Sequence, residues 1–161
     1  MTIKEGEKIP ASKIRIMGEN GATEVSTDEF FAGKKVALFS VPGAFTPTCS
    51  AQHLPGFIAH ADAIKAKGID VIACIAVNDV FVMDAWGKDR GVGNKVVMVA
   101  DGNGDLTKKL GLELDATGFG LGVRGQRFSM IVEDCTVSKL NVEEAGAFEV
   151  SKAEVILNQL D

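Results

Sequence analysis

Apolar residues along the chain form two kinds of pattern. Short apolar runs rich in β-branched residues are typical of buried strands, and they occur at residues 35–41, 70–77, 96–100, 128–132 and 137–142. Stretches with apolar residues at helical spacing occur at residues 47–67, 79–90 and 105–110. Strands therefore first alternate with helices and then follow one another directly. This order predicts an α/β fold, a mixed β-sheet flanked by helices on both faces.

The N-terminal part is predicted to begin with a small hairpin. Residues 13–17 and 22–25 are two short runs separated by a turn that starts and ends with glycine. A short helix capped at Ser26 or Thr27 should follow, because both residue types favour the N-cap position.

Proline, glycine and serine indicate the ends of the later helices. Pro55 lies inside the helix 47–67 and is expected to kink it, whereas Gly68 should end it. The pattern Ser151-x-x-Glu154 is expected to cap the last helix.

Composition and charge narrow the class of protein. The chain has 161 residues, of which 46% are hydrophobic, and this suits a single domain over residues 1–161 with an adequate core. There are 17 basic and 22 acidic residues, a net charge of −5, and the lysines are scattered. We therefore expect neither a nucleic acid nor an anionic membrane as a partner.

The cysteine count and the N-terminus bear on the compartment. Three cysteines, an odd number in a long chain, argue against a secreted disulfide framework. The first residues contain no apolar signal core, and no run of 18 apolar residues occurs. A cytoplasmic protein, or one that has already been processed, is the expectation.

Cys49 is the main candidate for chemistry. It lies where the strand 35–41 gives way to the helix 47–67, with Thr46 suited to the N-cap and Pro47 to the first helical position. Cys49 is then the third helical residue, close to unpaired backbone N–H groups and the positive end of the helix dipole. Both favour a thiolate.

A thiolate at this position needs a further donor. The helix dipole contributes about 0.3 to 1 kcal/mol, whereas a hydrogen bond to a charged group contributes about 1.5 to 3 kcal/mol. We therefore expect an arginine at the sulfur. Arg124 and Arg127, just before the strand 128–132, are the two candidates.

The pattern Pro42-x-x-x-Thr46-x-x-Cys49 resembles the active-site signature of the peroxiredoxins, and the likeness extends in order along nearly the whole chain, towards the type II (fifth) subfamily. The further matching segments are Cys49-Ser50-Ala51-Gln52-His53-Leu54-Pro55-Gly56-Phe57, Val77-Asn78-Asp79, Ala85-Trp86-Gly87, Arg127-Phe128-Ser129-Met130 and Leu140-Asn141-Val142-Glu143. The resemblance implies a thioredoxin-like fold and a thiol-dependent peroxidase. Such an enzyme reduces hydrogen peroxide and organic hydroperoxides through a cysteine thiolate that becomes sulfenic acid.

The resemblance also implies roles for individual residues. Cys49 would be the nucleophile, Arg127 its electrostatic partner, Thr46 a hydroxyl that holds peroxide and sulfur, and Pro42 a shield against water. The amides of Gly43, Ala44 and Cys49 would point into the pocket, which Phe45, His53 and Phe119 would help to line.

The resemblance further bears on partners and cofactors. Glutathione with a glutaredoxin, or a thioredoxin, is expected to reduce the oxidised cysteine, and a homodimer is expected. No metal, flavin or nicotinamide is called for.

Other interpretations remain open. A thiol-disulfide oxidoreductase shares the fold and a cysteine at a helix start, but here Thr46 occupies the first position of its C-x-x-C motif. A non-catalytic binding module of the same fold would have an unreactive Cys49.

His53, four residues after Cys49, could form a Cys/His pair or support the site by packing, whereas a metal site lacks further ligands at suitable spacing.

The glycine-rich loop 115–126 contains a formal G-x-G-x-x-G match at residues 120–125. A dinucleotide fingerprint follows a strand and opens a helix, whereas this loop precedes the strand 128–132. The match is interpreted as accidental.

Cys74 is the possible resolving cysteine. It lies three residues before the end of the strand at Val77, so about 3.3 Å per residue places it roughly 10 Å below the sheet edge. A disulfide requires Cα atoms within roughly 7 Å, so bonding to Cys49 would require local unwinding. The stretch from Ala147 to Ser151, where some peroxiredoxins carry a resolving cysteine, has none. We therefore predict a one-cysteine cycle with a buried Cys74.

Overall fold

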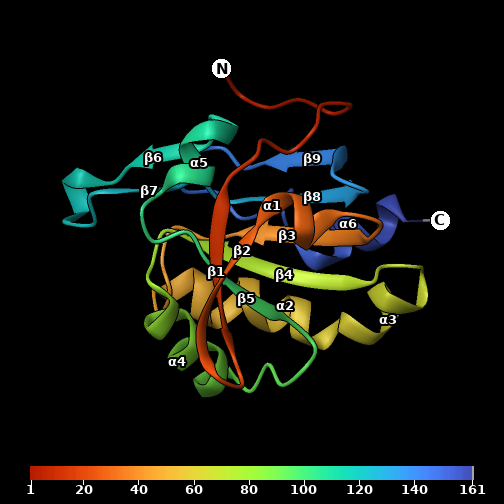
Figure 1. Cartoon of the computed structure of the whole chain (residues 1–161). Coiled ribbons are helices and arrows are strands. Elements are labelled where there is room, and N and C mark those ends of the chain that lie inside the picture. The colour runs from red at the N-terminus through yellow and green to blue at the C-terminus, as the bar shows by residue number, and fades with distance from the viewer. Residues whose placement is uncertain (161) are drawn as a thin grey trace.

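The computed structural model describes residues 1–160, and its centre is a seven-stranded sheet. The strand order is β2-β1-β5-β4-β3-β8-β9, with β3, β4 and β5 parallel and the outer pairings antiparallel. The strands are β1 (Lys13–Gly18), β2 (Gly21–Ser26), β3 (Lys35–Ser40), β4 (Val71–Ala76), β5 (Val97–Ala100), β8 (Phe128–Glu133) and β9 (Thr136–Val142). The predicted mixed α/β sheet is confirmed (Figure 1).

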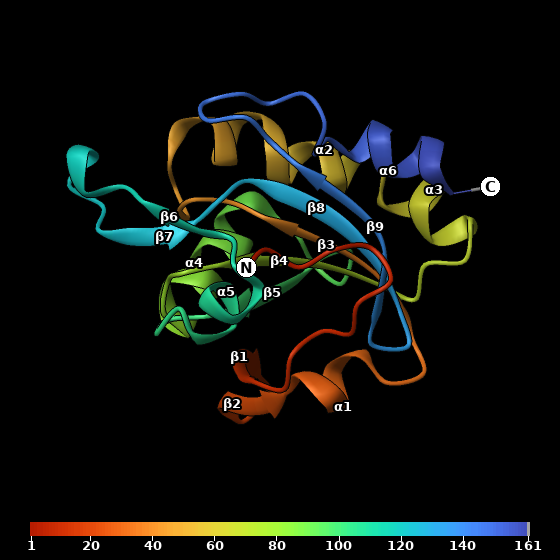
Figure 2. The same cartoon turned by 90° about the horizontal axis from the view of Figure 1, so that it is seen from above.

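Helices cover both faces of the sheet. They are α1 (Thr27–Phe31), the π-turn η1 (Cys49–His53), α2 (Leu54–Ala59), α3 (Ala61–Ala66), α4 (Val80–Arg90), α5 (Asp105–Leu110) and α6 (Ala153–Gln159). Figure 2 shows α2, α3 and α6 together on one side and α1 on the other.

Both faces of the central strands are buried because each strand alternates its side chains between two cores. On β3, Ala37 and Phe39 pack into the core under α2, α3, α4 and α6, whereas Val36 and Leu38 pack into the core under α1 and α5. Cys74 on β4 lies on the first of these faces, the one that also contains Cys49.

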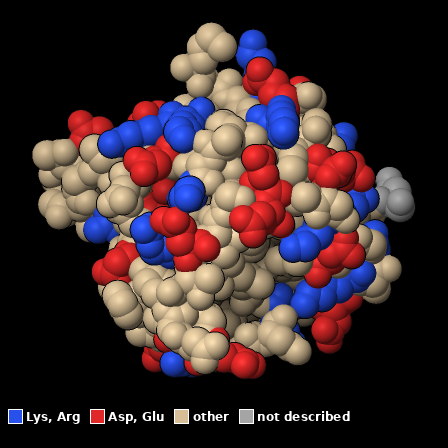
Figure 3. All heavy atoms as spheres, viewed as in Figure 1, with Lys and Arg blue, Asp and Glu red and all other residues tan. Residues whose placement is uncertain are grey.

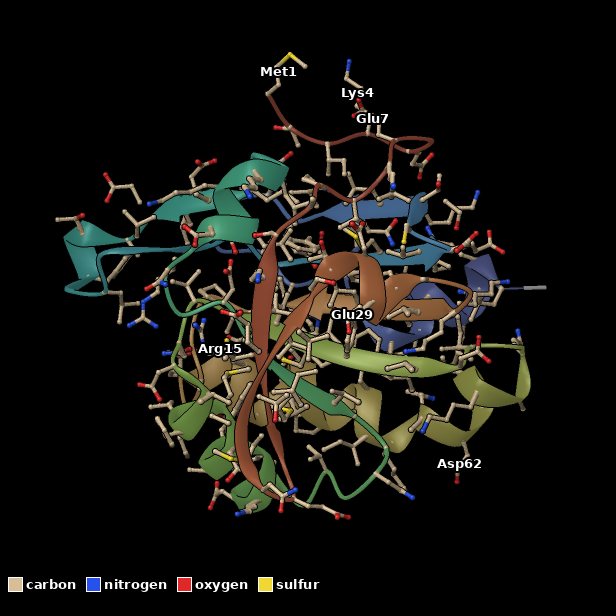
Figure 4. The ribbon with its side chains drawn as sticks, in the orientation of Figure 1. Met1, Lys4, Glu7, Arg15, Glu29 and Asp62 are labelled. Atoms are coloured by element: carbon tan, nitrogen blue, oxygen red, sulfur yellow. The ribbon has the colours of Figure 1, made fainter. Side chains whose placement is uncertain are left out.

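The N-terminal segment closes the second core. Its amides at Ile3 and Ile9 donate to the carbonyls of Leu110 and Cys135, and both isoleucines are buried. Lys4 and Glu7 lie on the outer side of this segment, with Met1 beyond them (Figure 4).

Charges of both signs are interspersed over the face shown in Figure 3, with no extended basic surface there. Among residues 1–160, no helix is long and apolar enough to cross a membrane.

The long helix predicted at residues 47–67 differs from the observed one. The chain breaks at His60 (φ −98°, ψ 6°) between α2 and α3. Pro55 lies in the first turn of α2, directly after the π-turn η1, where a proline is tolerated. Gly68, with φ 101°, follows the end of α3 as predicted.

Two other local predictions were wrong. Ser151 does not cap α6, whose N-cap is Lys152 without a side-chain hydrogen bond, because the Ser151 hydroxyl donates to Glu143 instead. Part of the predicted glycine-rich loop 115–126 is a strand, β7 (Val123–Gly125), which pairs with β6 (Glu113–Asp115) in a second, two-stranded sheet. This small sheet projects from the body in Figures 1 and 2 and opens no helix.

The other predicted helices and strands lie within a residue or two of the observed ones. The first hairpin is β1 and β2, and the hydroxyl of Ser26 caps α1 by accepting from the Glu29 amide. Asp79 caps α4 in the same way, because its carboxylate accepts from the Val82 amide at 2.9 Å.

Candidate active site

Cys49 begins the π-turn that follows β3 and a short loop. The helical bonding starts when the amide of Ser50 donates to the carbonyl of Thr46 at 2.9 Å, and Leu54 then donates to the carbonyl of Cys49. The latter is an i→i−5 bond, the defining feature of a π-turn, which is frequent at functional sites. The side chain of Cys49 is 0% exposed.

Arg127 supplies the donor that the thiolate requires. Its Nη2 donates to Cys49 Sγ at 3.1 Å. The residue comes directly before β8, whose first residue Phe128 pairs with Ser40 at the end of β3. Because Cys49 follows the C-terminal end of β3 and Arg127 precedes the N-terminal end of β8, the antiparallel pairing brings the guanidinium and the sulfur to the same end of these two strands.

The second guanidinium nitrogen of Arg127 contacts His53. Arg127 Nη1 lies 2.8 Å from His53 Nδ1, and His53 Nε2 lies 3.0 Å from the carbonyl of Ser151. A carbonyl only accepts, so Nε2 carries the proton and Nδ1 accepts from the arginine. Burial and the positive charge of Arg127 lower the pKa of His53 to about 3, so the imidazole is neutral.

Glu143 holds the loop that carries Ser151. One carboxylate oxygen, Oε2, accepts from the Ser151 hydroxyl at 2.6 Å, the Ser151 amide at 2.9 Å and the Glu149 amide at 2.7 Å. Burial raises the pKa of Glu143, but hydrogen bonds from Ser151 and the neighbouring amides outweigh it and hold the pKa below its usual range. Glu143 is therefore an ionised carboxylate.

Phe148 covers this group from the same loop. Its ring centroid lies 5.7 Å from the guanidinium carbon of Arg127 and 5.0 Å from the His53 ring, which it meets edge-on. A cation above an aromatic face is favourable, so Phe148 helps to fix the arginine.

Thr46 comes directly before the first helical residue, and its hydroxyl hydrogen-bonds within the loop that precedes the helix. Its hydroxyl donates to the carbonyl of Gly43 at 2.7 Å. The lone pairs of the Thr46 hydroxyl oxygen therefore stay available to accept a hydrogen bond. A Cβ on Gly43 would approach both Thr46 Cγ2 and Arg124 Nη1 to 3.1 Å, so glycine allows the two side chains to close over the loop.

The predicted pocket role of the Ala44 amide was wrong. That amide donates to Asn78 Oδ1 at 2.9 Å, so it ties the loop to the end of β4. Phe45 has φ 66° and is half exposed, and its ring lies 6.4 Å from that of buried Trp86. Trp86 in turn donates to the Ser50 hydroxyl at 2.9 Å.

A cleft of about 530 Å³ opens beside Arg127. It also contains Pro42 and Phe119, two of the residues predicted for the pocket. Phe119 is 86% exposed and ends the short 3-10 helix η2 (Thr117–Phe119) midway between β6 and β7. The other lining residues are Thr48, Leu114, Ala116, Leu121, Gln126, Glu143, Glu144, Ala145, Gly146 and Ala147. Phe45 is not among them.

Comparison with known proteins now identifies the family. The Redoxin family matches residues 4–157 of the chain. The chain is a peroxiredoxin. It is 50% identical to peroxiredoxin-2B of Arabidopsis thaliana over 159 residues, which cover 98% of each protein. It is 48% identical to the chloroplastic peroxiredoxin-2E of the same plant, and this match covers 99% of this chain and 70% of the relative.

Solved peroxiredoxin structures agree with the fold. The reduced Prx3 of Vibrio vulnificus in complex with H₂O₂ superposes with a TM-score of 0.96 at 49% identity, over 99% of this chain and 100% of the other. This peroxiredoxin has the thioredoxin-like fold and is a thiol-dependent peroxidase, an oxidoreductase that uses a hydroperoxide and a thiol reductant.

Cys74 is buried in this peroxiredoxin, as predicted. It is 0% exposed, and burial, together with the nearby Cys49, raises its pKa well above the usual range. It pairs across the sheet with Phe39 and Met98 and belongs to the apolar core.

Sequence reasoning missed the residues that support the arginine. Glu143 is predicted only as part of a segment that resembles the peroxiredoxins, Ser151 only as a helix cap, and Phe148 has no predicted role. An acidic residue directly after an apolar strand, as in Val142-Glu143, is the only local signal for Glu143. Nothing local in the sequence indicates that the 148–151 loop returns to His53.

Proposed function

We propose that Cys49 is the nucleophile of this thiol peroxidase and that Arg127, Thr46 and Pro42 form its immediate surroundings. The contact of 3.1 Å from Arg127 Nη2 to Cys49 Sγ is the observation that supports the assignment. A guanidinium at this distance favours the thiolate over the thiol and also stabilises negative charge that develops on the peroxide oxygens.

The chemical step follows from that arrangement. The thiolate attacks the terminal oxygen of the hydroperoxide, an S–O bond forms as the O–O bond breaks, and the remaining oxygen takes a proton and leaves as water or an alcohol. Cys49 becomes sulfenic acid. Two equivalents of thiol then return it to the thiol with release of water and a disulfide.

Thr46 orients the peroxide in this proposal. Since its hydroxyl proton is directed at the Gly43 carbonyl, its oxygen is free to accept a hydrogen bond from the peroxide O–H. Hydrogen peroxide is one substrate of this chain, a proposal supported by the peroxide complex of the Vibrio protein.

Organic hydroperoxides are the second substrate class. The cleft beside Pro42 and Arg127 has apolar side chains at Leu114, Phe119 and Leu121, which suit an alkyl group. The sulfur itself is fully covered, so Pro42 or its neighbours must shift to admit the peroxide.

The cycle uses one cysteine of this chain. Glutathione with a glutaredoxin, or a thioredoxin, reduces the sulfenic acid directly, because Cys74 is fully buried.

The peroxiredoxin works in the cytoplasm as a single domain and a homodimer. Light scattering that gives a mass of 17.0 kDa at tens of micromolar would contradict the dimer.

One experiment tests the catalytic assignment. One equivalent of hydrogen peroxide is added to the reduced protein, and intact mass and peptide mapping follow. We expect a gain of one oxygen on the Cys49 peptide, or a mixed disulfide there when a thiol is present. Cys49→Ser should show neither change, and oxidation located first at Cys74 or Cys135 would refute the assignment.

A further inference from the structure

Glu143 belongs to a closed ring of hydrogen bonds with Arg127, His53 and Ser151, and Arg127 connects this ring to the reactive sulfur of Cys49. Going outward from Cys49 Sγ, Arg127 Nη2 lies at 3.1 Å, Arg127 Nη1 lies 2.8 Å from His53 Nδ1, and His53 Nε2 lies 3.0 Å from the Ser151 carbonyl. The amide and hydroxyl of Ser151 then donate to Glu143.

The backbone closes the ring. The amide of Glu143 donates to the carbonyl of Arg127 at 3.0 Å, which continues the pairing of β8 and β9 by one residue beyond Phe128 and Val142. Glu143 is therefore fixed to Arg127 through its main chain, and to the partner of His53 through its side chain.

We infer that Glu143 is a positioning residue for the peroxidase reaction, which acts through the Ser151 carbonyl and His53 to hold the Arg127 guanidinium against Cys49. This inference rests on the proposed function of Cys49.

The reason is geometric. A guanidinium has five N–H donors in a rigid plane, so fixing one nitrogen fixes the direction of the others. His53 can accept from Arg127 only when its proton is on Nε2, and Nε2 keeps the proton because the Ser151 carbonyl faces it. Glu143 holds that carbonyl in place, because its oxygen takes three hydrogen bonds from the 149–151 backbone and the Ser151 hydroxyl.

Of the other ionisable groups near the site, Arg124 donates to the Leu121 carbonyl, Arg90 on α4 donates to the Ser50 carbonyl, and Glu144 lines the cleft. Cys74 on β4 is fully buried. Lys152 lies over the Phe148 ring at 5.2 Å. Glu143 itself is only 9% exposed.

The test compares Glu143→Ala and Glu143→Gln with the parent protein and with Glu154→Ala. Glu154 lies on α6, three residues beyond Ser151, and its side chain is 60% exposed, so its removal changes the net charge equally without touching the ring. Two readouts are used: the pH profile of iodoacetamide alkylation mapped to the Cys49 peptide, and the ¹⁵N chemical shifts of the His53 ring.

Glu143→Ala is expected to move the alkylation profile towards higher pH by about one unit, a fall of about tenfold in rate below the midpoint. The His53 ¹⁵N shifts should indicate a mixture of tautomers in place of a single Nε2–H form. Glu143→Gln keeps an acceptor oxygen and should lie between Glu143→Ala and the parent, whereas Glu154→Ala should match the parent.

A folded Glu143→Ala with the parent's profile and tautomer overturns the inference. If Glu143→Ala does not fold, Glu143→Asp replaces it in the test, because its shorter side chain withdraws the carboxylate from the loop. An alkylation profile of Glu143→Asp that matches the parent's would also overturn the inference. Both readouts are independent of turnover. A parent protein that consumes no peroxide would refute the proposed function and leave the positioning result standing.

Discussion

Arg127 donates to His53 Nδ1 at 2.8 Å, and this contact makes the histidine an acceptor for the arginine rather than a base for Cys49. The other ring nitrogen is committed to the Ser151 carbonyl. His53 therefore has no free nitrogen with which to take a proton from the thiol, and its contribution to the site is orientation.

Arg127→Ala is expected to reduce the alkylation rate of Cys49 at neutral pH by about tenfold or more, because a hydrogen bond to a charged group contributes about 1.5 to 3 kcal/mol. The measurement is the pH profile of iodoacetamide alkylation. Arg15→Ala is the matched control, since Arg15 lies on β1 (Figure 4) and forms an ion pair with the exposed Glu24. An unchanged profile in Arg127→Ala would refute the electrostatic role.

Thr46→Val is expected to abolish most peroxide reduction while costing only about 1 kcal/mol of stability from the lost hydrogen bond to Gly43. The melting temperature should fall by roughly 2 to 4 °C. Thr46→Ser keeps the hydroxyl and should retain activity. A variant that melts earlier but turns over at the parent's rate would show that Thr46 only shapes the loop.

His53 should make stability depend on pH. Its pKa is about 3 in the folded protein because of burial and Arg127, whereas the unfolded chain has the usual value near 6.5. The unfolded state therefore binds the extra proton first, and stability is lost as pH falls from about 6.5 towards 3, by at most about 1.4 kcal/mol per pH unit.

Urea unfolding of the parent and of His53→Gln at pH 7, 5.5 and 4.5 measures this effect. The stability difference between the two proteins should shrink as pH falls, because only the parent carries the histidine. A constant difference across the three pH values would contradict the neutral, buried imidazole.

Cys74→Ser should turn over at near the parent's rate when an external thiol system is supplied. Any loss should appear in stability, because a hydroxyl replaces a sulfur at a position that is 0% exposed. Cys74→Ala separates this polar cost from the loss of the sulfur. A disulfide between Cys49 and Cys74 mapped in the parent, together with lost turnover in both variants, would establish Cys74 as a resolving cysteine.

Cys135→Gly should change the free energy of unfolding by less than about 1 kcal/mol. Cys135 has φ 70° in the tight turn after β8, a conformation that costs a non-glycine residue about 1 to 2 kcal/mol. Its side chain is nevertheless only 9% exposed and packs in the second core, so glycine also loses apolar contacts. Chemical denaturation measures the balance, and a loss clearly above about 1 kcal/mol would show that packing dominates.

Much of the fold could be predicted because its signals are local. The strands β3, β4 and β8 are continuous apolar runs, and Asp79 and Ser26 cap helices as their residue types predict. Cys49 could also be proposed from its place at a helix start, and the energetic need for a donor predicted an arginine beside it. The resemblance to the peroxiredoxins then selected Arg127.

The remaining features depend on contacts between distant parts of the chain. Ser151 has the sequence of a helix cap, yet its hydroxyl donates to Glu143, a buried carboxylate that offers a charged acceptor. Likewise the Ala44 amide is taken by Asn78, which is 34 residues away. Local propensity cannot reveal such competition.

The π-turn between Cys49 and His53 amounts to one extra residue inside a helix. Since each residue of an α-helix turns the chain by about 100°, removing one residue from the turn would rotate Cys49 by that angle relative to α2. Leu54 and Phe57 could keep their places against the sheet while the sulfur turned away from Arg127. The direction of the reactive group is thus set separately from the packing of the helix that carries it, and the two can change independently as the sequence diverges.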